Sequence, residues 1–215
     1  MTVHDLAAAM PDIPTLRDRC RALAALDAIL GGEWACRSYD PAWGPGEEMA
    51  SMDNGSGDGY SIVFTADGAY VRGFDHESPM SPWAAEPVAL WPGLVDQVPE
   101  AFRAQVEEPA FTMDGVPSIT VCLWRTHDDT RWHAGSIDFP LGEHGDPDGA
   151  DWLFSLLTGL TAKAYQEWAE DYYETEVPLD AVEHVLALRP LTAEIVAALN
   201  ADAGMADLEE IGYPA

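Results

Sequence analysis

The densest group of reactive side chains lies in residues 73–83, GFDHESPMSPW. A histidine beside carboxylates can act as a general base or ligate a metal, because the acid orients the imidazole and raises its basicity. The alternative is that Asp75 and Ser78 cap turns while His76 faces solvent. The segment supplies a candidate loop site that comprises Asp75, His76, Glu77, Ser78 and Trp83.

A second polar group lies in residues 127–133, at the tip of a predicted hairpin. His127, Asp129 and His133 could ligate zinc if the turn brought their side chains together. Their spacing matches no known ligand pattern, and a solvated turn explains them better than a metal site does. We therefore expect no bound metal and no cofactor.

Other acidic segments are weaker candidates. Asp146, Asp148 and Asp151 lack the full calcium-loop pattern and are typical of a helix start, and the adjacent Glu143 and His144 form no known motif. The glycine-rich segment 53–59 could wrap a cation or remain a flexible loop. The chain has no G-x-S-x-G, P-loop or G-x-G-x-x-G motif.

An aromatic stripe follows Thr161, which is a predicted helix N-cap. The helical spacing places aromatic side chains on one face and carboxylates around it. Core packing is one explanation, and a face that binds a basic protein is the other. This candidate partner face comprises Tyr165, Glu167, Trp168, Glu170, Asp171, Tyr172 and Glu174.

The predicted order of elements indicates an α+β fold with an N-terminal helix, antiparallel hairpins that form a sheet, and a C-terminal helical block. We expect residues 1–215 to form one domain. Apolar periodicity predicts the first helix over 15–30. Residues 40–59 have no period and predict a long flexible loop. Further predicted elements are a strand at 33–39, hairpins at 60–74 and 118–137, helices from 151 to 157, 161 to 174, 179 to 188 and 192 to 199, and a final turn around 206–211.

The composition and net charge of the chain argue against some classes of function. The 215 residues carry 38 acidic and 10 basic side chains, for a net charge of −28. So few cations argue against binding nucleic acid or an anionic membrane. Three cysteines without C-x-x-C spacing predict reduced thiols, and the lack of a long apolar run or a basic leader predicts a cytoplasmic protein. Residues expected in the core are Leu23, Ile62, Phe64, Val121, Leu123 and Trp152.

Three stretches, FDHESPMSPW, RWHAGSI and DPDGADWLF, resemble those of uncharacterised soluble proteins from GC-rich bacteria, a resemblance that implies no activity. In outline, the order of helix, antiparallel sheet and helices resembles the bacterial immunity proteins related to the fungal cell-wall assembly regulator. The Leu-Pro-x-x-Tyr segment usual in that group does not occur here.

These observations favour an acidic interaction protein that binds a basic protein, as an immunity or regulatory factor. The alternative is a metal-assisted hydrolase that uses His76 or the turn with His127 and His133. Convergence of those groups in one pocket would favour the enzyme, and an aromatic or acidic surface patch would favour the binding protein. The sequence does not define an oligomeric state.

Overall fold

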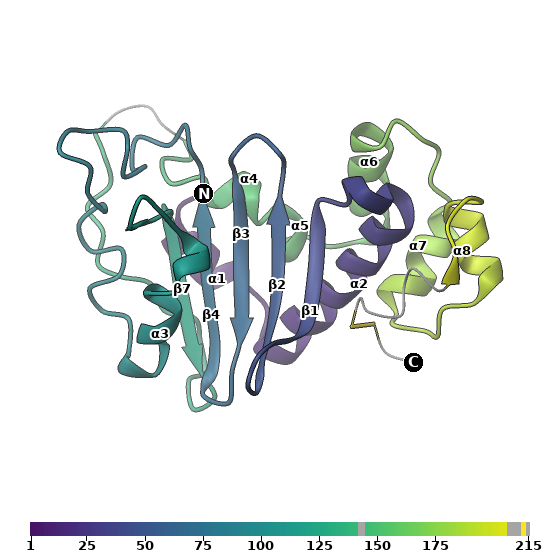
Figure 1. Cartoon of the computed structure of the whole chain (residues 1–215), viewed down its shortest axis with the longest axis horizontal. Coiled ribbons are helices and arrows are strands. Elements are labelled where there is room, and N and C mark those ends of the chain that lie inside the picture. The colour runs from purple at the N-terminus through teal and green to yellow at the C-terminus, as the bar shows by residue number, and fades with distance from the viewer. Residues whose placement is uncertain (142–144, 206–211, 214–215) are drawn as a thin grey trace.

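A five-stranded antiparallel sheet organises the chain, and the computed structural model describes residues 1–141, 145–205 and 212–213. The strand order is β1-β2-β3-β4-β7, so consecutive strands pair except where a long segment precedes β7. Helices α1, α4 and α5 lie behind the sheet, α2 runs from behind its lower edge out past β1, and α6, α7 and α8 extend to that side beyond β1 (Figure 1). The predicted α+β class is confirmed.

The observed elements have the following bounds. The strands are β1 (Arg37–Gly44), β2 (Glu47–Asp53), β3 (Gly59–Phe64), β4 (Gly68–Phe74), β5 (Thr112–Met113), β6 (Val116–Pro117) and β7 (Val121–Thr126). The α-helices are α1 (Val3–Ala9), α2 (Ile13–Gly31), α3 (Arg103–Val106), α4 (Ala150–Leu153), α5 (Ser155–Thr158), α6 (Ala162–Tyr172), α7 (Leu179–Leu186) and α8 (Ala193–Leu199). Short 3-10 turns are η1 (Gly32–Trp34), η2 (Glu100–Phe102) and η3 (Pro109–Phe111).

The predicted hairpin at 60–74 is confirmed as β3 and β4, which pair from Gly59 with Phe74 to Phe64 with Ala69. Its turn depends on Gly68, whose φ of +149° is rarely adopted by other residues. A Cβ at Gly68 would also collide with the carbonyl oxygen of Arg125 on β7. The glycine therefore sets both the turn and the approach of the next strand.

The prediction of a flexible loop over residues 40–59 is wrong, because this segment forms most of β1 and β2. Ala50 and Met52 alternate into the core, and β2 pairs with β3 along its length. Acidic residues, glycine and proline hide this pattern in the sequence, and the strand forms because its neighbours pair with it. The expected strand at 33–39 begins only at Arg37, after η1.

The second predicted hairpin is only partly formed. Strand β7 is present, but the return arm meets it at a single bridge between Trp124 and His133. Beyond that bridge the arm leaves the sheet and contacts residues 91–97, where Trp91 donates to the carbonyl of Asp138 and Gln97 donates to the hydroxyl of Ser136. These alternative partners replace the ladder that alternation in the sequence predicts.

The helix predicted over 15–30 is confirmed as α2, although its N-cap is Asp12, which accepts the backbone N–H of Thr15. Thr161 caps α6 as predicted, and Thr192 caps α8, the helix predicted over 192–199. The helix predicted over 151–157 is split into α4 and α5. The turn expected around 206–211 lies outside the described residues. Within the described residues no helix is long and apolar enough to cross a membrane.

The core lies on both faces of β4 and β7, because alternate side chains point to opposite sides. Val71, Val121 and Leu123 join the main core with α2, whereas Tyr70 and Trp124 pack with the segment around α3. Burial is confirmed for the expected core residues Leu23, Ile62, Phe64, Val121 and Leu123.

The prediction that Trp152 is buried is wrong, because 42% of its surface is exposed. On α4 the buried positions are taken by Ala150 and Leu153. The indole N–H of Trp152 donates instead to Asp75 at the surface, at 3.0 Å.

Candidate functional site

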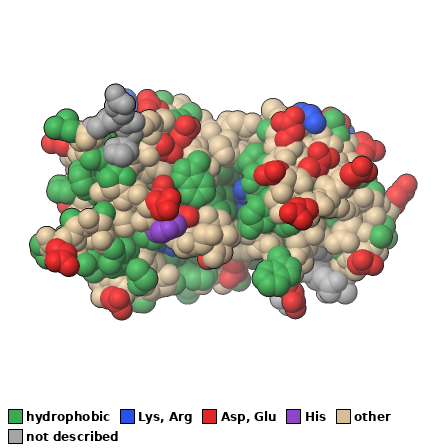
Figure 2. Space-filling view, turned by 90° about the horizontal axis from the view of Figure 1, so that it is seen from above, with side chains coloured by type: hydrophobic (Ala, Val, Ile, Leu, Met, Phe, Trp, Pro, Cys, Tyr) green, Lys and Arg blue, Asp and Glu red, His purple; other side chains and the backbone are tan. Residues whose placement is uncertain are grey.

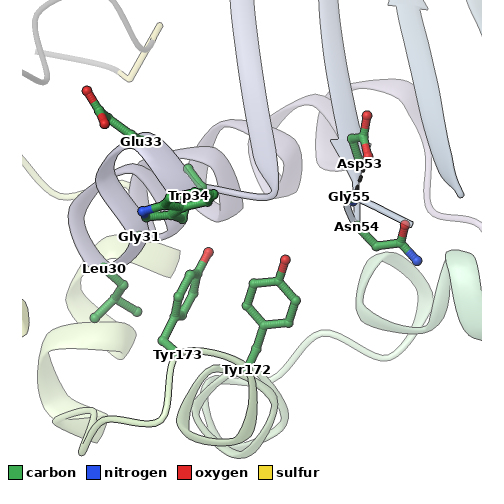
Figure 3. Close-up of a pocket in the computed structure, with 10 residues that line it drawn as sticks. Leu30, Gly31, Glu33, Trp34, Asp53, Asn54, Gly55, Tyr172 and Tyr173 are labelled. Atoms are coloured by element: carbon green, nitrogen blue, oxygen red, sulfur yellow. Dashed lines mark hydrogen bonds between the residues drawn. The ribbon is translucent and has the colours of Figure 1, made fainter. Parts of the chain in front are cut away.

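An aromatic groove lies where the ends of α2, β2 and α6 come together (Figure 3). Its volume is about 780 Å³. In Figure 3 the hydroxyls of Tyr172 and Tyr173 point into the space between Trp34 and Asn54. The residues that line this aromatic groove are Leu30, Gly31, Glu33, Trp34, Ala35, Asp53, Asn54, Gly55, Tyr172 and Tyr173.

Trp34 is the most unusual side chain of the groove, since 82% of its surface is exposed. It is presented by the turn after α2, where Gly32 has a φ of +53° and ends the helix. Glu33 and Trp34 therefore stand at a tip outside the core. An indole held in solvent contributes little to folding and is typical of a binding surface.

The opposite wall of the groove comes from a stack of aromatic rings on α6. Trp168 stacks with Tyr172 at 4.9 Å between ring centroids, and Tyr172 meets Tyr173 edge to face at 5.0 Å. The guanidinium of Arg37 lies 4.0 Å from the ring centroid of Trp168. These contacts hold Tyr172 in place at the surface.

A buried polar network supports the stack from below. Arg37 Nη1 lies 3.1 Å from Asp27 Oδ2, and the Tyr165 hydroxyl donates to Asp27 Oδ1 at 2.7 Å. Burial raises the pKa of Asp27, although Arg37 and the hydroxyl of Tyr165 oppose this. Burial disfavours the charge of Arg37, but Asp27 together with Tyr60, Cys36 and Tyr165 outweighs this effect and raises the arginine pKa. Burial also raises the pKa of Cys36 to about 12, so this thiol is not a nucleophile near neutral pH.

A smaller cavity of about 270 Å³ adjoins the aromatic groove, and the two share Asn54 and Tyr172. We call it the Arg37 cavity. Asp75 helps to form it by holding the indole of Trp152 through a hydrogen bond. Its lining residues are Cys36, Arg37, Met52, Asn54, Trp152, Leu153, Ser155, Leu156, Trp168 and Tyr172.

The residues of the candidate loop site do not act as one group in the structure, because His76 pairs with a residue outside that loop. His76 Nδ1 lies 2.6 Å from Oδ1 of Asp58, and the same oxygen accepts the backbone N–H of His76. The hydrogen bond to Asp58 raises the pKa of His76. Burial of Asp58 would raise its own pKa, but hydrogen bonds from His76 and Asn54 outweigh this and lower it. The carboxylate that orients the histidine is therefore Asp58, not the adjacent Asp75 or Glu77.

The other members of the loop site have structural contacts. Ser78 is buried and donates to the carbonyl of Pro147, and Trp83 packs edge to face on Phe74. The backbone N–H of Glu77 donates to Asp75, as in the turn that the sequence allowed. Ser78 is thus tied into the fold and unavailable as a nucleophile.

Asp58, Asp75 and His76 form one group that could hold a metal ion, since their ligand atoms lie within 4.8 Å of one another. Among the described residues no other group of three such side chains converges in this way, so the turn with His127, Asp129 and His133 does not form one. There Asp129 accepts the backbone N–H of Thr126 and lies 3.3 Å from His133 Nε2.

The weaker acidic candidates act as caps. Asp146 accepts the backbone N–H groups of Asp151 and Trp152, and the buried Asp148 accepts those of Val3 and Ala150. Burial raises the pKa of Asp148 to about 6. Glu143 and His144 lie outside the described residues.

The candidate partner face on α6 is divided between core and surface. Tyr165 is buried and Trp168 is half-buried, whereas Tyr172 is 42% exposed. Glu170 accepts the backbone N–H of Val177, while Glu167, Asp171 and Glu174 are exposed.

Trp34 and Arg37 are not among the site residues predicted from the sequence, and Asp58 enters there only as part of the segment 53–59 that could wrap a cation. A tryptophan directly after the helix-ending pair Gly31-Gly32 was a usable signal for Trp34. Nothing local marks Arg37 or Asp58, because their roles depend on contacts distant in sequence.

No family model matches the chain, and the comparisons with curated proteins and with solved structures return no match.

Proposed function

We propose that this chain is a binding protein that holds a cationic segment of a basic protein in the aromatic groove, as an immunity or regulatory factor. The observation that carries the proposal is the exposed Trp34, which faces Tyr172 and Tyr173 across the groove (Figure 3). Aromatic faces attract Arg and Lys side chains, and exposed aromatic patches are typical of interfaces.

Charge complementarity supports a cationic occupant. Glu33 and Asp53 line the groove, and Glu170, Glu174 and Glu176 line a neighbouring hollow of about 800 Å³. Figure 2 shows acidic side chains spread over the half of the molecule where α6, α7 and α8 lie, beside a hollow with apolar walls. A net charge of −28 steers a basic partner toward this surface and disfavours an acidic one.

Tyr173 adds a polar group to the groove. Its hydroxyl oxygen is buried and makes no hydrogen bond of standard geometry among the described residues, although the backbone N–H of Cys36 lies near it. Burial raises the pKa of Tyr173, so the hydroxyl remains neutral and can accept an N–H from a guanidinium. The groove thus offers a cation both ring faces and an acceptor.

The test is a titration of the full chain with a short, blocked arginine peptide, followed by calorimetry and tryptophan fluorescence. The same peptide with citrulline in place of arginine keeps the shape and removes the charge. We expect saturable binding of the arginine peptide only, weakening as salt shortens the Debye length from about 30 Å at 0.01 M to about 10 Å at 0.1 M. Trp34→Ala should weaken binding by about 2 kcal/mol, or about 30-fold.

Two double variants that each remove two negative charges distinguish binding at the groove from attraction by the negative charge of the whole protein. Glu33→Gln with Asp53→Asn removes two charges at the groove, and Glu100→Gln with Glu107→Gln removes two exposed charges elsewhere. We expect the first pair to weaken binding much more than the second. Equal effects of the two pairs, or equal binding of the citrulline peptide, would contradict the proposal.

A second candidate function, a metal-assisted hydrolase, is supported by one observation, the convergence of Asp58, Asp75 and His76. Asp58, Asp75 and His76 would hold the metal, and the metal would supply an activated water. Measurement of the metal content of the purified protein decides whether these three residues bind a metal or only stabilise the fold.

A further inference from the structure

The Arg37 cavity is a separate feature from the exposed groove. It is smaller, at about 270 Å³, and three aromatic side chains, Trp152, Trp168 and Tyr172, contribute to its walls. Pockets for drug-sized ligands span roughly 300–1,000 Å³, so this cavity suits a single ring with a short substituent. Met52, Leu153 and Leu156 complete apolar walls that favour a planar apolar body.

Arg37 brings unused donors to this cavity. Its Nη1 has partners in Asp27 and in the Cys36 thiol, but Nε is buried without a hydrogen-bond partner among the described residues. The residue is 7% exposed and lines the cavity. Buried N–H groups are nearly always paired, so the Nε–H of Arg37 is a donor that an acceptor on a ligand in this cavity can satisfy.

The charges around Arg37 define the kind of acceptor. Asp27 already neutralises the guanidinium, and the chain's net charge of −28 disfavours an anion. Of the ten described residues that line the cavity, none is acidic, which disfavours a cation and contrasts with the rim of the aromatic groove. A neutral carbonyl oxygen satisfies the arginine donors at the lowest electrostatic cost.

We propose that the Arg37 cavity binds a small, neutral, planar ring compound whose carbonyl oxygen accepts hydrogen bonds from Arg37. The ring packs between Trp152 and Tyr172, and the hydrogen bond from Trp152 to Asp75 fixes one of these walls. This assignment does not depend on a cationic segment occupying the aromatic groove.

The test is a nuclear magnetic resonance titration of the full chain with benzamide, the simplest ring of this class. The indole N–H signals of Trp152 and Trp168 and the Nε–H signal of Arg37 report on the cavity. We expect saturable shifts with a dissociation constant on the order of 1 mM, the weak affinity usual for so few atoms. Benzylamine and benzoate have the same ring with a cation or an anion, and each should bind at least about 10-fold more weakly than benzamide.

A variant that fills the cavity provides the control. Ser155 is exposed and lines the cavity, so Ser155→Phe should abolish the benzamide shifts. Ser136→Phe makes the same change at an exposed serine that donates to Gln97 and should leave them unchanged. The proposal is overturned if benzamide fails to saturate, if benzylamine or benzoate binds as well, or if Ser155→Phe binds normally. Should Ser155→Phe not fold, the ranking of the three probes on the unmodified chain decides.

Discussion

Replacing Arg37 with Met should destabilise the protein by an amount that depends on pH. Arg37 and Asp27 are both buried and lie 3.1 Å apart. Removing one partner of a buried pair leaves the other charge uncompensated, at a cost of about 3–5 kcal/mol. Because Tyr165 and Cys36 still donate to Asp27, we expect about 3 kcal/mol, the lower end of that range.

The pH dependence has a definite sign. Burial already raises the pKa of Asp27, and loss of Arg37 removes an interaction that lowers it. A carboxyl whose pKa is higher in the folded than in the unfolded state binds its proton more tightly when folded. Its contribution to stability is therefore present at low pH and is lost as pH rises through the folded-state pKa. The stability deficit of Arg37→Met should shrink as pH falls.

The assay is guanidinium unfolding at pH 7.5 and at pH 5.5, with two comparison variants. Arg72 is half-buried and donates to the carbonyl of Ser118, with no carboxylate partner among the described residues, so Arg72→Met should show a pH-independent loss. The double variant Asp27→Leu, Arg37→Met should recover much of the stability, because it removes both charges. A loss under about 1 kcal/mol for Arg37→Met, far below the cost of an unpaired buried charge, or a deficit that grows on acidification, would refute the reasoning.

Three further predictions concern the core and the loop site. Leu123→Ala should lower the free energy of unfolding by about 2–5 kcal/mol in chemical denaturation, because it opens a cavity in the core; a loss well under about 1 kcal/mol would contradict that burial. Asp58→Asn should lower the pKa of His76 in a nuclear magnetic resonance titration, because the hydrogen bond that the His76 ring donates to Asp58 is the main reason that this pKa is raised. The stability that this pair contributes should be complete below the unfolded-state histidine pKa and should be lost as pH rises through the folded-state pKa. Metal analysis of protein purified without chelators should find no stoichiometric zinc; a metal that disappears in His76→Ala but remains in His133→Ala would instead favour the hydrolase at Asp58, Asp75 and His76.

Short-range sequence features were sufficient to predict the elements whose formation depends on neighbouring residues. The hairpin of β3 and β4 was predictable because its apolar residues alternate and the pair Asp67-Gly68 supplies the turn. The start of α6 was predictable because Thr161 caps it with a side-chain hydrogen bond. Strands β1 and β2 were not, because their pairing with β3 overrides residues of low strand propensity.

The candidate site was predictable only in part for the same reason. The exposure of Tyr172 and the burial of Tyr165 depend on which turns of α6 face Arg37 and the core, and periodicity alone left both readings open. The pairing of His76 with Asp58 joins residues 18 positions apart, through two loops whose approach depends on the whole sheet. Sequence patterns of short range contain no information about such pairs.

The outer strand β1 has a consequence for how copies of this chain meet. An open sheet exposes unpaired backbone donors and acceptors at its rim, where a second chain can add a strand and begin aggregation. Here β1 contains Asp40 and Pro41, its register shifts between Asp40 and Gly44, and Gly212 packs against Tyr39 and Pro41. The proline lacks an N–H, and the irregular stretch cannot continue a flat ladder. The sheet is therefore closed to edge-to-edge growth on that side.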